Sequence, residues 1–249
     1  MAIQRISLIG VPVDICAPEN LENEIMEILE KPGAKQIIFL SIWDLLKARR
    51  KGDFSEAVKN ADLVIPVSKS ILRGAKYLKK DIPVRYNPFN AVIQILGILE
   101  SHYKTVYLLG SRKKTLDKAA RNVHDTFPNL RVVGRYVGYY SKNIEDDIIQ
   151  AIYKAQPSLV LISDGIKEKN CWSYRRRNRF SSSIFLYYKD AFGIFSERIQ
   201  RVREQTFERG HEIYAEIRHN PFKFFLIFPY MKYIVILAWY RLFRKQDKK

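Results

Sequence analysis

Apolar and polar positions alternate with two different periods along the first two-thirds of the chain. Short continuous apolar runs indicate buried β-strands, and they cover residues 6–13, 36–40, 63–67, 105–109, 130–134 and 158–163. Between them, apolar residues recur every three to four positions, which predicts helices over residues 21–29, 45–50, 71–78, 89–102, 115–127 and 144–155. Strands that alternate with helices in this way are typical of βα units that build a mostly parallel sheet.

This pattern predicts an α/β protein with a Rossmann-like, mostly parallel sheet. We assign residues 1–193 to this core and expect one further strand within residues 180–188. Residues 194–249 form a C-terminal helical appendage, in which residues 194–217 read as a strongly charged helix. A length of 249 residues fits one large α/β domain or two small ones.

The last part of the appendage alternates aromatic and aliphatic residues with single positive charges. Its longest uncharged runs, residues 224–231 and 233–240, are far shorter than the roughly 20 apolar residues that a membrane-spanning helix needs. Pro229 and Lys232 interrupt the stretch. The pattern predicts short helices in the membrane interface, with contacts from Phe224, Phe225, Phe228, Trp239 and Tyr240. A buried oligomer contact and a hydrophobic helix packed on the core are the alternatives.

Charge narrows the choice of partners. The chain holds 43 Lys+Arg and 26 Asp+Glu, a net charge of +17, and residues 167–249 alone hold 19 basic and 8 acidic residues. Such a field attracts nucleic acid, anionic lipid headgroups or a phosphorylated ligand. Two cysteines are too few for a disulfide scaffold and favour a reducing compartment. The N-terminus lacks a signal-peptide pattern, so export by that route is not expected.

Three strand ends carry candidate binding residues, because α/β sheets bind ligands beyond the carboxyl ends of their strands. Gly110, Ser111 and Arg112 follow one strand, where glycine would let a diphosphate approach the backbone and Ser111 could donate to it. Gly138 and Tyr139 follow the next, and the ring could stack on a base. Asp164 and Gly165 follow a third, and the carboxylate could accept a ribose hydroxyl. A solvated turn, a surface tyrosine and a turn-capping acid are the alternatives.

Other chemistry finds little support in the sequence. The four histidines, His102, His124, His211 and His219, lack the spacing of a metal site, so we expect neither metal nor cofactor. No Walker, G-x-S-x-G or C-x-x-C motif is present. No zinc-finger spacing or RNP-type aromatic motif is found either, so nucleic-acid binding would rest on charge alone and is not favoured.

Several short segments, in order along the chain, carry a resemblance to a known family. They are GVPVD (10–14), NADLVIP (60–66), VYLLGS (106–111) and FPNLRVVGRYVGYY (127–140), and GHEIY (210–214) followed by Asn220-Pro221 near the end. Together they resemble the WecG/TagA/CpsF bacterial glycosyltransferases, which include N-acetylmannosaminyltransferases. The resemblance runs through nearly the whole chain, and residues 127–140 are its most specific part.

The resemblance implies an enzyme that is peripheral on the cytoplasmic, inner face of a bacterial membrane. Such enzymes commonly transfer N-acetylmannosamine from a UDP donor to an undecaprenyl-diphosphate-linked acceptor sugar, with inversion and without a metal. An inverting transfer needs a general base and cations that hold the departing diphosphate. By this resemblance the partners are a UDP-sugar, a polyprenyl-diphosphate-linked acceptor and an anionic membrane surface. We expect the diphosphate and lipid ligands to be Arg85, Arg201, Arg203, Arg209 and Arg218.

The chain departs from the family at positions that bear chemistry. The family's acid in a PDG motif is Val67 here, which cannot accept a proton, and its Thr-x-Asn motif begins with Phe39. Its RVxGxD motif keeps Arg85 but replaces the acid by Asn90, and an appendage arginine is Glu216. A replacement base would come from Asp14, Asp164 or Asp190.

Two accounts follow from these departures. The chain is a membrane-associated glycosyltransferase with an altered donor or acceptor, or it is a catalytically inactive relative that binds or scaffolds in envelope-glycan assembly. A basic nucleic-acid binder is a third and weaker account. The sugar, the acceptor and the oligomeric state, including a homo-oligomer, stay open at this stage.

Overall fold

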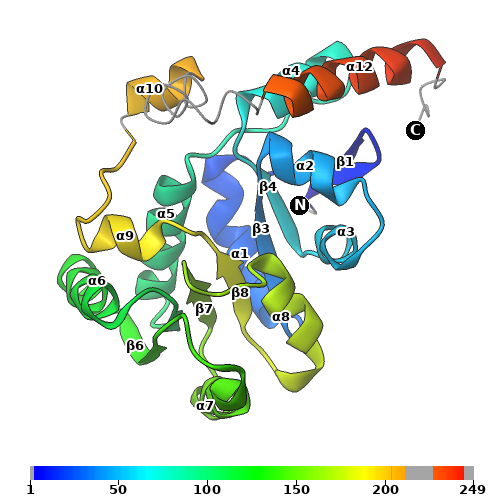
Figure 1. Ribbon diagram of the computed structural model, residues 1–249. Helices are drawn as coiled ribbons and strands as arrows, with labels where there is room; N and C mark the ends of the chain where they lie inside the picture. The colour runs from blue at the N-terminus through cyan, green and yellow to red at the C-terminus, as the bar shows by residue number, and fades with distance from the viewer. Residues whose placement is uncertain (1–2, 203, 211–226, 244–249) are drawn as a thin grey trace.

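The central element is a six-stranded parallel sheet. The computed structural model of the chain describes residues 3–202, 204–210 and 227–243. The strand order is β4-β3-β8-β7-β5-β6, and all neighbours run parallel (Figure 1). The strands are β3 (Lys35–Leu40), β4 (Leu63–Pro66), β5 (Thr105–Leu109), β6 (Arg131–Tyr136), β7 (Leu159–Ile162) and β8 (Ile184–Tyr187). The predicted α/β class is confirmed, as is the expected strand within residues 180–188.

Helices cover both faces of the sheet, because successive strand residues point to opposite faces. Ile37 and Phe39 belong to one core, and Ile38 and Leu40 belong to the other. The first core includes α1 (Leu21–Glu30), α5 (Pro88–Ser101), α6 (Lys113–Thr126) and α9 (Ala191–Phe195). The opposite face is covered by α2 (Ile42–Ala48), α3 (Asp53–Lys59), α4 (Lys69–Tyr77), α7 (Glu145–Ala155) and α8 (Asn170–Arg176). Short 3₁₀ turns are η1 (Pro18–Asn20), η2 (Lys142–Ile144) and η3 (Arg177–Arg179).

The N-terminal strand prediction needs a correction. Instead of one strand over residues 6–13, the chain forms an antiparallel hairpin of β1 (Gln4–Leu8) and β2 (Val11–Ile15), outside the main sheet. Ile9 and Gly10 turn it with positive φ angles of 47° and 86°. The buried Asp14 accepts hydrogen bonds from Arg5 Nε (2.6 Å) and from the Val64 backbone N–H (2.6 Å). The hairpin thereby lies beside β4, the edge strand of the sheet.

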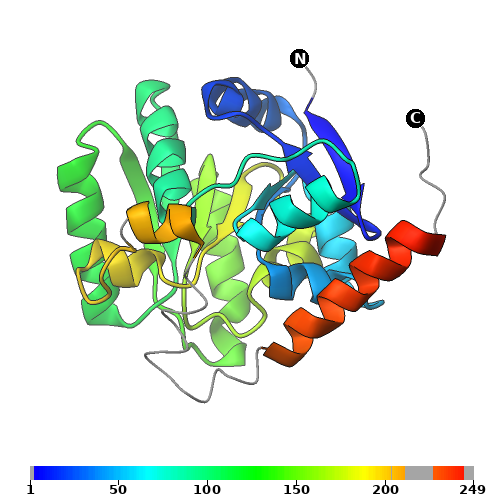
Figure 2. The same ribbon diagram turned by 90° about the horizontal axis from the view of Figure 1, so that it is seen from above.

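The segment expected to be one helix over residues 194–217 is divided. The helix α9 ends at Phe195, and α10 (Glu204–Arg209) follows after an extended connection. Residues 203 and 211–226 lie outside the described part of the chain, so the remainder of that prediction falls there. Seen from above, α10 lies apart from the C-terminal helix (Figure 2).

A single helix, α12 (Ile227–Phe243), stands where short, interrupted helices were expected. Pro229 does not break it because this residue lies in the first helical turn, where a backbone N–H has no partner within the helix. One side of α12 packs on the core through Tyr233 and Leu237, and Tyr233 Oη donates to Ser70 O at 2.8 Å. The alternative of a helix packed on the core is therefore correct for this side. Among the described helices, none is long and apolar enough to cross a membrane.

Candidate functional site

Three loops meet at the carboxyl ends of β5, β6 and β7. The backbone N–H of Ser111 donates to Asp164 O (2.6 Å), that of Gly138 to Ser111 O (2.8 Å), and that of Tyr139 to Gly165 O (3.0 Å). The arrangement gathers the seven residues predicted to bind the nucleotide sugar: Gly110, Ser111, Arg112, Gly138, Tyr139, Asp164 and Gly165. We call these residues the loop cluster. It occupies the edge of the sheet at which α/β proteins bind their ligands.

The glycines of the loop cluster allow three backbones to touch. A Cβ atom on Gly138 would lie 2.8 Å from Asp164 O and 3.0 Å from Ser111 N. A Cβ atom on Gly110 would lie 2.9 Å from Asp164 O, and its φ of +135° also disfavours any side chain. The space that a side chain on Gly110 would take is therefore filled by the neighbouring loop. Glycine at these positions fixes the shape of the site.

The side chains on the outer surface of the loop cluster form a polar and aromatic group. The Tyr139 side chain is 60% exposed, and its hydroxyl donates to Asp164 Oδ2 at 3.2 Å. The guanidinium of Arg112 lies 5.8 Å from the Tyr139 ring centroid, and Arg198 Nη2 lies 3.8 Å from Asp164 Oδ2. Ser111 differs from expectation, because its hydroxyl is buried and has no hydrogen-bond partner among the described residues. The exposed groups can stack on a base, accept a hydrogen bond from a hydroxyl and attract phosphate.

Three of the four arginines in the basic run at residues 174–179 pair with neighbouring acids. Arg176 pairs with Glu145 and Glu168, both at 2.7 Å, and Arg175 pairs with Asp53 at 2.5 Å. Burial alone would raise the pKa of Glu168, but hydrogen bonds and charges from Arg176 and Arg175 outweigh it and lower that pKa. This run is therefore part of a structural ion-pair network, which removes the densest positive cluster from the argument for nucleic-acid binding.

A second hollow lies at the carboxyl end of β4, beneath α10. This cavity has a volume of about 400 Å³, and we call it the appendage cavity. The Tyr86 N–H donates to Pro66 O at 3.1 Å, which places Arg85 beside the end of β4. The Arg85 guanidinium stacks on the Phe207 ring at 3.6 Å and donates to Phe207 O. Lys69 Nζ donates to Glu208 O at 3.0 Å, so two cations join the core to α10 at this cavity.

The other predicted phosphate ligands are only partly placed. Arg201 Nη2 donates to Asn90 Oδ1 at 2.5 Å, beside the appendage cavity. Arg209 is the last residue of α10, where the structure places its backbone. Arg203, Arg218, Phe224 and Phe225 lie outside the described residues.

The replacement bases considered from the sequence occupy different environments. Asp14 is 1% exposed and bound within the hairpin, which excludes it from contact with a substrate. Asp164 belongs to the loop cluster, and Asp190 directly precedes α9 at the end of β8. Val67, at the position of the family's acid, is half-buried and packs against the first core.

Comparison with known protein families shows to which family this chain belongs. A model of the glycosyl transferase WecG/TagA/CpsF family matches residues 6–247. The chain belongs to this family. The match includes the hairpin, the sheet, the loop cluster and nearly all of the appendage, so the resemblance seen in the sequence is confirmed.

Curated relatives of this chain are distant in sequence. Three of them bear the name N-acetylglucosaminyldiphosphoundecaprenol N-acetyl-beta-D-mannosaminyltransferase. The protein from Bacillus subtilis is 18% identical over 173 residues, 69% of this chain and 66% of the relative. Those from Bacillus spizizenii and Staphylococcus aureus (strain NCTC 8325 / PS 47) are 20% and 18% identical, over 62% and 57% of this chain. The aligned regions span 66%, 60% and 56% of the three relatives.

The close packing of the loop cluster leads to a testable prediction about stability. We expect Gly138→Ala to lower the free energy of unfolding by about 1–3 kcal/mol, because the new methyl group meets backbone atoms that cannot move independently. The matched control is Gly97→Ala within α5, where the nearest heavy atom outside the helix backbone is 3.9 Å away. That change should stabilise by up to about 1 kcal/mol. Equal effects of the two substitutions in urea unfolding would contradict this account of the loops.

Proposed function

We propose that this protein transfers N-acetylmannosamine, or a related sugar, from a UDP donor to an undecaprenyl-diphosphate-linked acceptor sugar, with inversion at the anomeric carbon. The observation that carries the proposal is the family match over residues 6–247. The names of the curated relatives, which specify an undecaprenol-diphosphate acceptor and a mannosaminyl transfer, supply the substrate class. The division into a core of residues 1–193 and an appendage of residues 194–249 is part of the same proposal.

The loop cluster is our proposed donor site. The exposed Tyr139 ring offers a stacking surface for uracil, and the Asp164 carboxylate can accept a hydrogen bond from a ribose hydroxyl. Arg112 precedes α6, and Lys113 and Lys114 begin it, so positive side chains surround a helix N-terminus. Both the side-chain charges and the helix dipole make this end of the site positive, which attracts an anionic donor. Asp164 in this role binds the donor and is not the proton acceptor.

The appendage cavity is our proposed place of reaction. Arg85 and Lys69 supply positive charge at the carboxyl end of β4, where charge develops on the departing diphosphate. The cavity volume of about 400 Å³ lies within the range of small-ligand sites. In this arrangement α10 forms one wall of the site, so the appendage completes a cavity that the core alone does not close.

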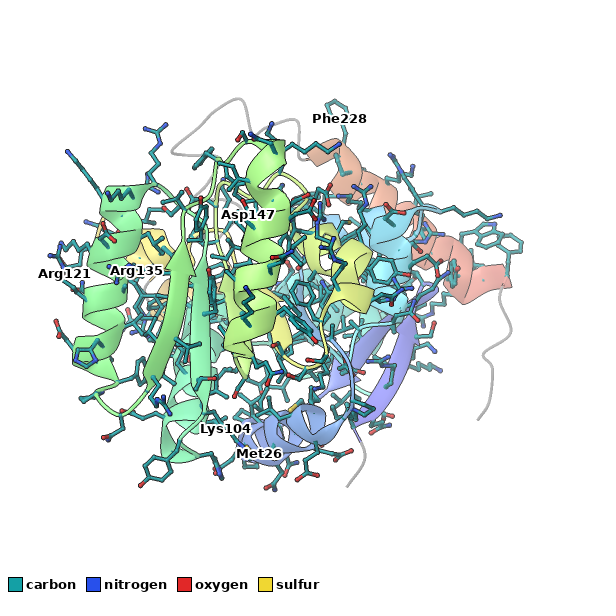
Figure 3. The ribbon with its side chains drawn as sticks, turned by 90° about the horizontal axis from the view of Figure 1, so that it is seen from below. Met26, Lys104, Arg121, Arg135, Asp147 and Phe228 are labelled. Carbon is teal, nitrogen blue, oxygen red and sulfur yellow. The ribbon has the colours of Figure 1, made fainter. Side chains whose placement is uncertain are left out.

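The outer side of α12 supports attachment to a membrane surface. Its large exposed apolar side chains are Phe228, Met231, Ile234, Val235, Trp239, Leu242 and Phe243. Figure 3 shows Phe228 projecting away from the body of the protein. Tyr240, expected to contact lipid, is instead half-buried and packs toward the core, with the Arg49 guanidinium 5.7 Å from its ring. We propose a peripheral location on the inner face of the membrane, with α12 lying in the interface.

This attachment predicts a loss of vesicle binding on removal of the apolar side chains. The double variant Val235→Ser/Trp239→Ser should lower partition into anionic phospholipid vesicles by about tenfold or more, since burying one such side chain contributes about 1.5–3 kcal/mol. Vesicle sedimentation measures it. Tyr103→Ser serves as the control, because Tyr103 is 81% exposed but lies outside α12, after α5. Unchanged vesicle binding of the double variant would show that α12 does not attach the protein to the membrane.

A second candidate function rests on a specific observation at β4. Val67 is half-buried at the position of the family's acid, and Phe39 packs in the first core at the start of the Thr-x-Asn position. Neither side chain can move a proton. A catalytically inactive relative that binds lipid-linked glycans and scaffolds their assembly would retain the fold and the helix α12 while tolerating both changes.

Titration with nucleotides tests the proposed function. A UDP-N-acetylhexosamine at 100 times its Kd should stabilise the folded protein by about 2.7 kcal/mol. For a chain of this size, that raises the Tm by about 5 °C or more, and calorimetry should give a saturable heat. ADP is the control, since it carries the same diphosphate on a different base. A folded protein that shows neither heat nor Tm shift with millimolar UDP or UDP-sugar would contradict the proposed donor site.

A further inference from the structure

The appendage cavity contains carboxylates that the core does not supply. Glu204 and Glu208 of α10 line it, together with Arg85, Asn87 and Asn90 from the segment that follows β4. Tyr86 also lines the cavity, but burial raises its pKa, so its hydroxyl stays protonated and cannot accept a proton at neutral pH. The carboxylates that can act as bases in this cavity therefore come from α10.

Of the two carboxylates, Glu204 has a defined orientation. Asn90 Nδ2 donates to its Oε2 at 3.2 Å and approaches its Oε1 at 3.4 Å. The same amide accepts a hydrogen bond from Arg201 Nη2 at its Oδ1 atom, at 2.5 Å. Because Arg201 can only donate, it fixes which end of the Asn90 amide faces Glu204. Among the described residues, by contrast, no hydrogen bond reaches the Glu208 carboxylate.

This amide orientation fixes how the Glu204 carboxylate is held. The Asn90 N–H donates to the carboxylate oxygens and leaves them able to accept a further hydrogen bond. One oxygen that accepts from Asn90 still has a second lone pair, and Glu204 is exposed and lines the cavity. Arg85 and Lys69 donate to the backbone oxygens of Phe207 and Glu208, which ties α10 to the core at the same cavity.

We propose that Glu204 is the general base of the transfer, supplied by the appendage, and that Arg201 and Asn90 position it. This inference rests on the proposed function. A Glu204 oxygen takes the proton of the acceptor hydroxyl, and the hydroxyl oxygen forms a bond to the anomeric carbon of the donor sugar. The bond from that carbon to the diphosphate oxygen breaks, and its electron pair leaves with UDP. A proton acceptor on α10 makes an acid at position 67 unnecessary.

The test compares two isosteric variants of the full chain in a transfer assay with a UDP-sugar and a lipid-diphosphate-linked acceptor. We expect Glu204→Gln to lower kcat by about 100- to 10,000-fold, with the KM for the donor changed less than about threefold. Glu197→Gln changes an exposed carboxylate of the appendage that pairs with Lys118 outside the cavity, and it should retain wild-type kcat within about threefold. The double variant Asn90→Asp/Glu204→Gln places a carboxylate at position 90 in place of the one lost at position 204. Its kcat should be at least about tenfold higher than that of Glu204→Gln.

Three outcomes would overturn the assignment. Wild-type kcat in the Glu204→Gln protein would show that Glu204 is not the general base. It would leave the proposed function intact. Equal losses in Glu204→Gln and Glu197→Gln would indicate a general effect of charge in the appendage. A wild-type protein that binds the donor but transfers nothing to water or to the acceptor would refute the proposed function itself, and the role of Glu204 with it.

Discussion

Replacing Asp14 by alanine is expected to lower the free energy of unfolding by about 3 kcal/mol. The Asp14 carboxylate is buried and accepts from Val64 N at 2.6 Å and from Arg5 at 2.6 and 2.9 Å. Alanine leaves the Val64 N–H buried without an acceptor, which alone costs about 1–3 kcal/mol. It also removes the charge that holds Arg5, although the 37% exposure of that side chain lets water replace part of the interaction. Urea unfolding followed by circular dichroism measures the change.

The matched control for this prediction is an ion pair on the surface. Glu56 and Lys59 are 2.9 Å apart, and both side chains are at least half exposed, so Glu56→Ala should change stability by less than about 0.5 kcal/mol. The Asp14 variant also separates a structural acid from a catalytic one, because at a temperature where it is folded we expect its transfer rate to be unchanged. A loss of activity in the folded Asp14→Ala protein would contradict the assignment of Asp14 to the hairpin alone.

The second large effect is expected at Arg85. We predict that Arg85→Met lowers the transfer rate about 100- to 1000-fold, because a methionine cannot stabilise negative charge on the departing diphosphate. The substitution also removes the guanidinium that stacks on Phe207 at 3.6 Å, so α10 loses one of its contacts to the core. A stacked cation contributes about 0.5–2 kcal/mol, and thermal unfolding separates that loss from the loss of rate.

Arg121→Met provides the control for charge. Arg121 lies on α6, and Figure 3 shows it beside Arg135, at the β6 edge of the sheet. We expect this variant to retain the wild-type rate within about twofold. It lowers the net charge of the protein by as much as Arg85→Met does. If both variants lose the same activity, the effect of Arg85 is one of overall charge, and the appendage cavity is not the place of reaction.

The parallel sheet was predictable from sequence because buried strands read as continuous apolar runs. The run at residues 105–109 predicts β5 with the bounds that the structure has. The hairpin was not predicted because its turn contains Ile9, an apolar residue with a positive φ. The hydrophobic run therefore continues through the turn. In the motif GVPVD, Gly10 therefore forms the hairpin turn and Asp14 holds the hairpin to β4. These structural roles explain the motif without a bound ligand.

The loop cluster was also predictable, because strand ends of a parallel sheet meet at one edge. Its internal packing was not, since only the distances show that Gly110 and Gly138 contact neighbouring backbone. Glu204 gave no signal of its own in the sequence, where it is one charge in a strongly charged segment. Its contact with Asn90 joins residues 114 positions apart, and such a pairing depends on how α10 folds back over the core.

Residues 227–243 form one helix although proline usually interrupts helices. Proline disrupts a helix interior, which made Pro229 an apparent break, but the helix begins two residues before it. One side of the resulting helix is required by the core, as the packing of Tyr233 over Gly74 indicates. The opposite side exposes large apolar side chains, and this asymmetry is what our membrane proposal explains.

The most direct test of the central claim is transfer by the purified full chain. Radiolabelled UDP-N-acetylmannosamine is incubated with an undecaprenyl-diphosphate-linked N-acetylglucosamine acceptor in anionic vesicles, and lipid-bound label is followed with time. We predict a labelled product that requires both substrates and whose new linkage has the inverted, β configuration. A folded protein that binds donor and vesicles yet forms no lipid-bound product, with this or other UDP-N-acetylhexosamines, would contradict the enzyme account and support the scaffolding one.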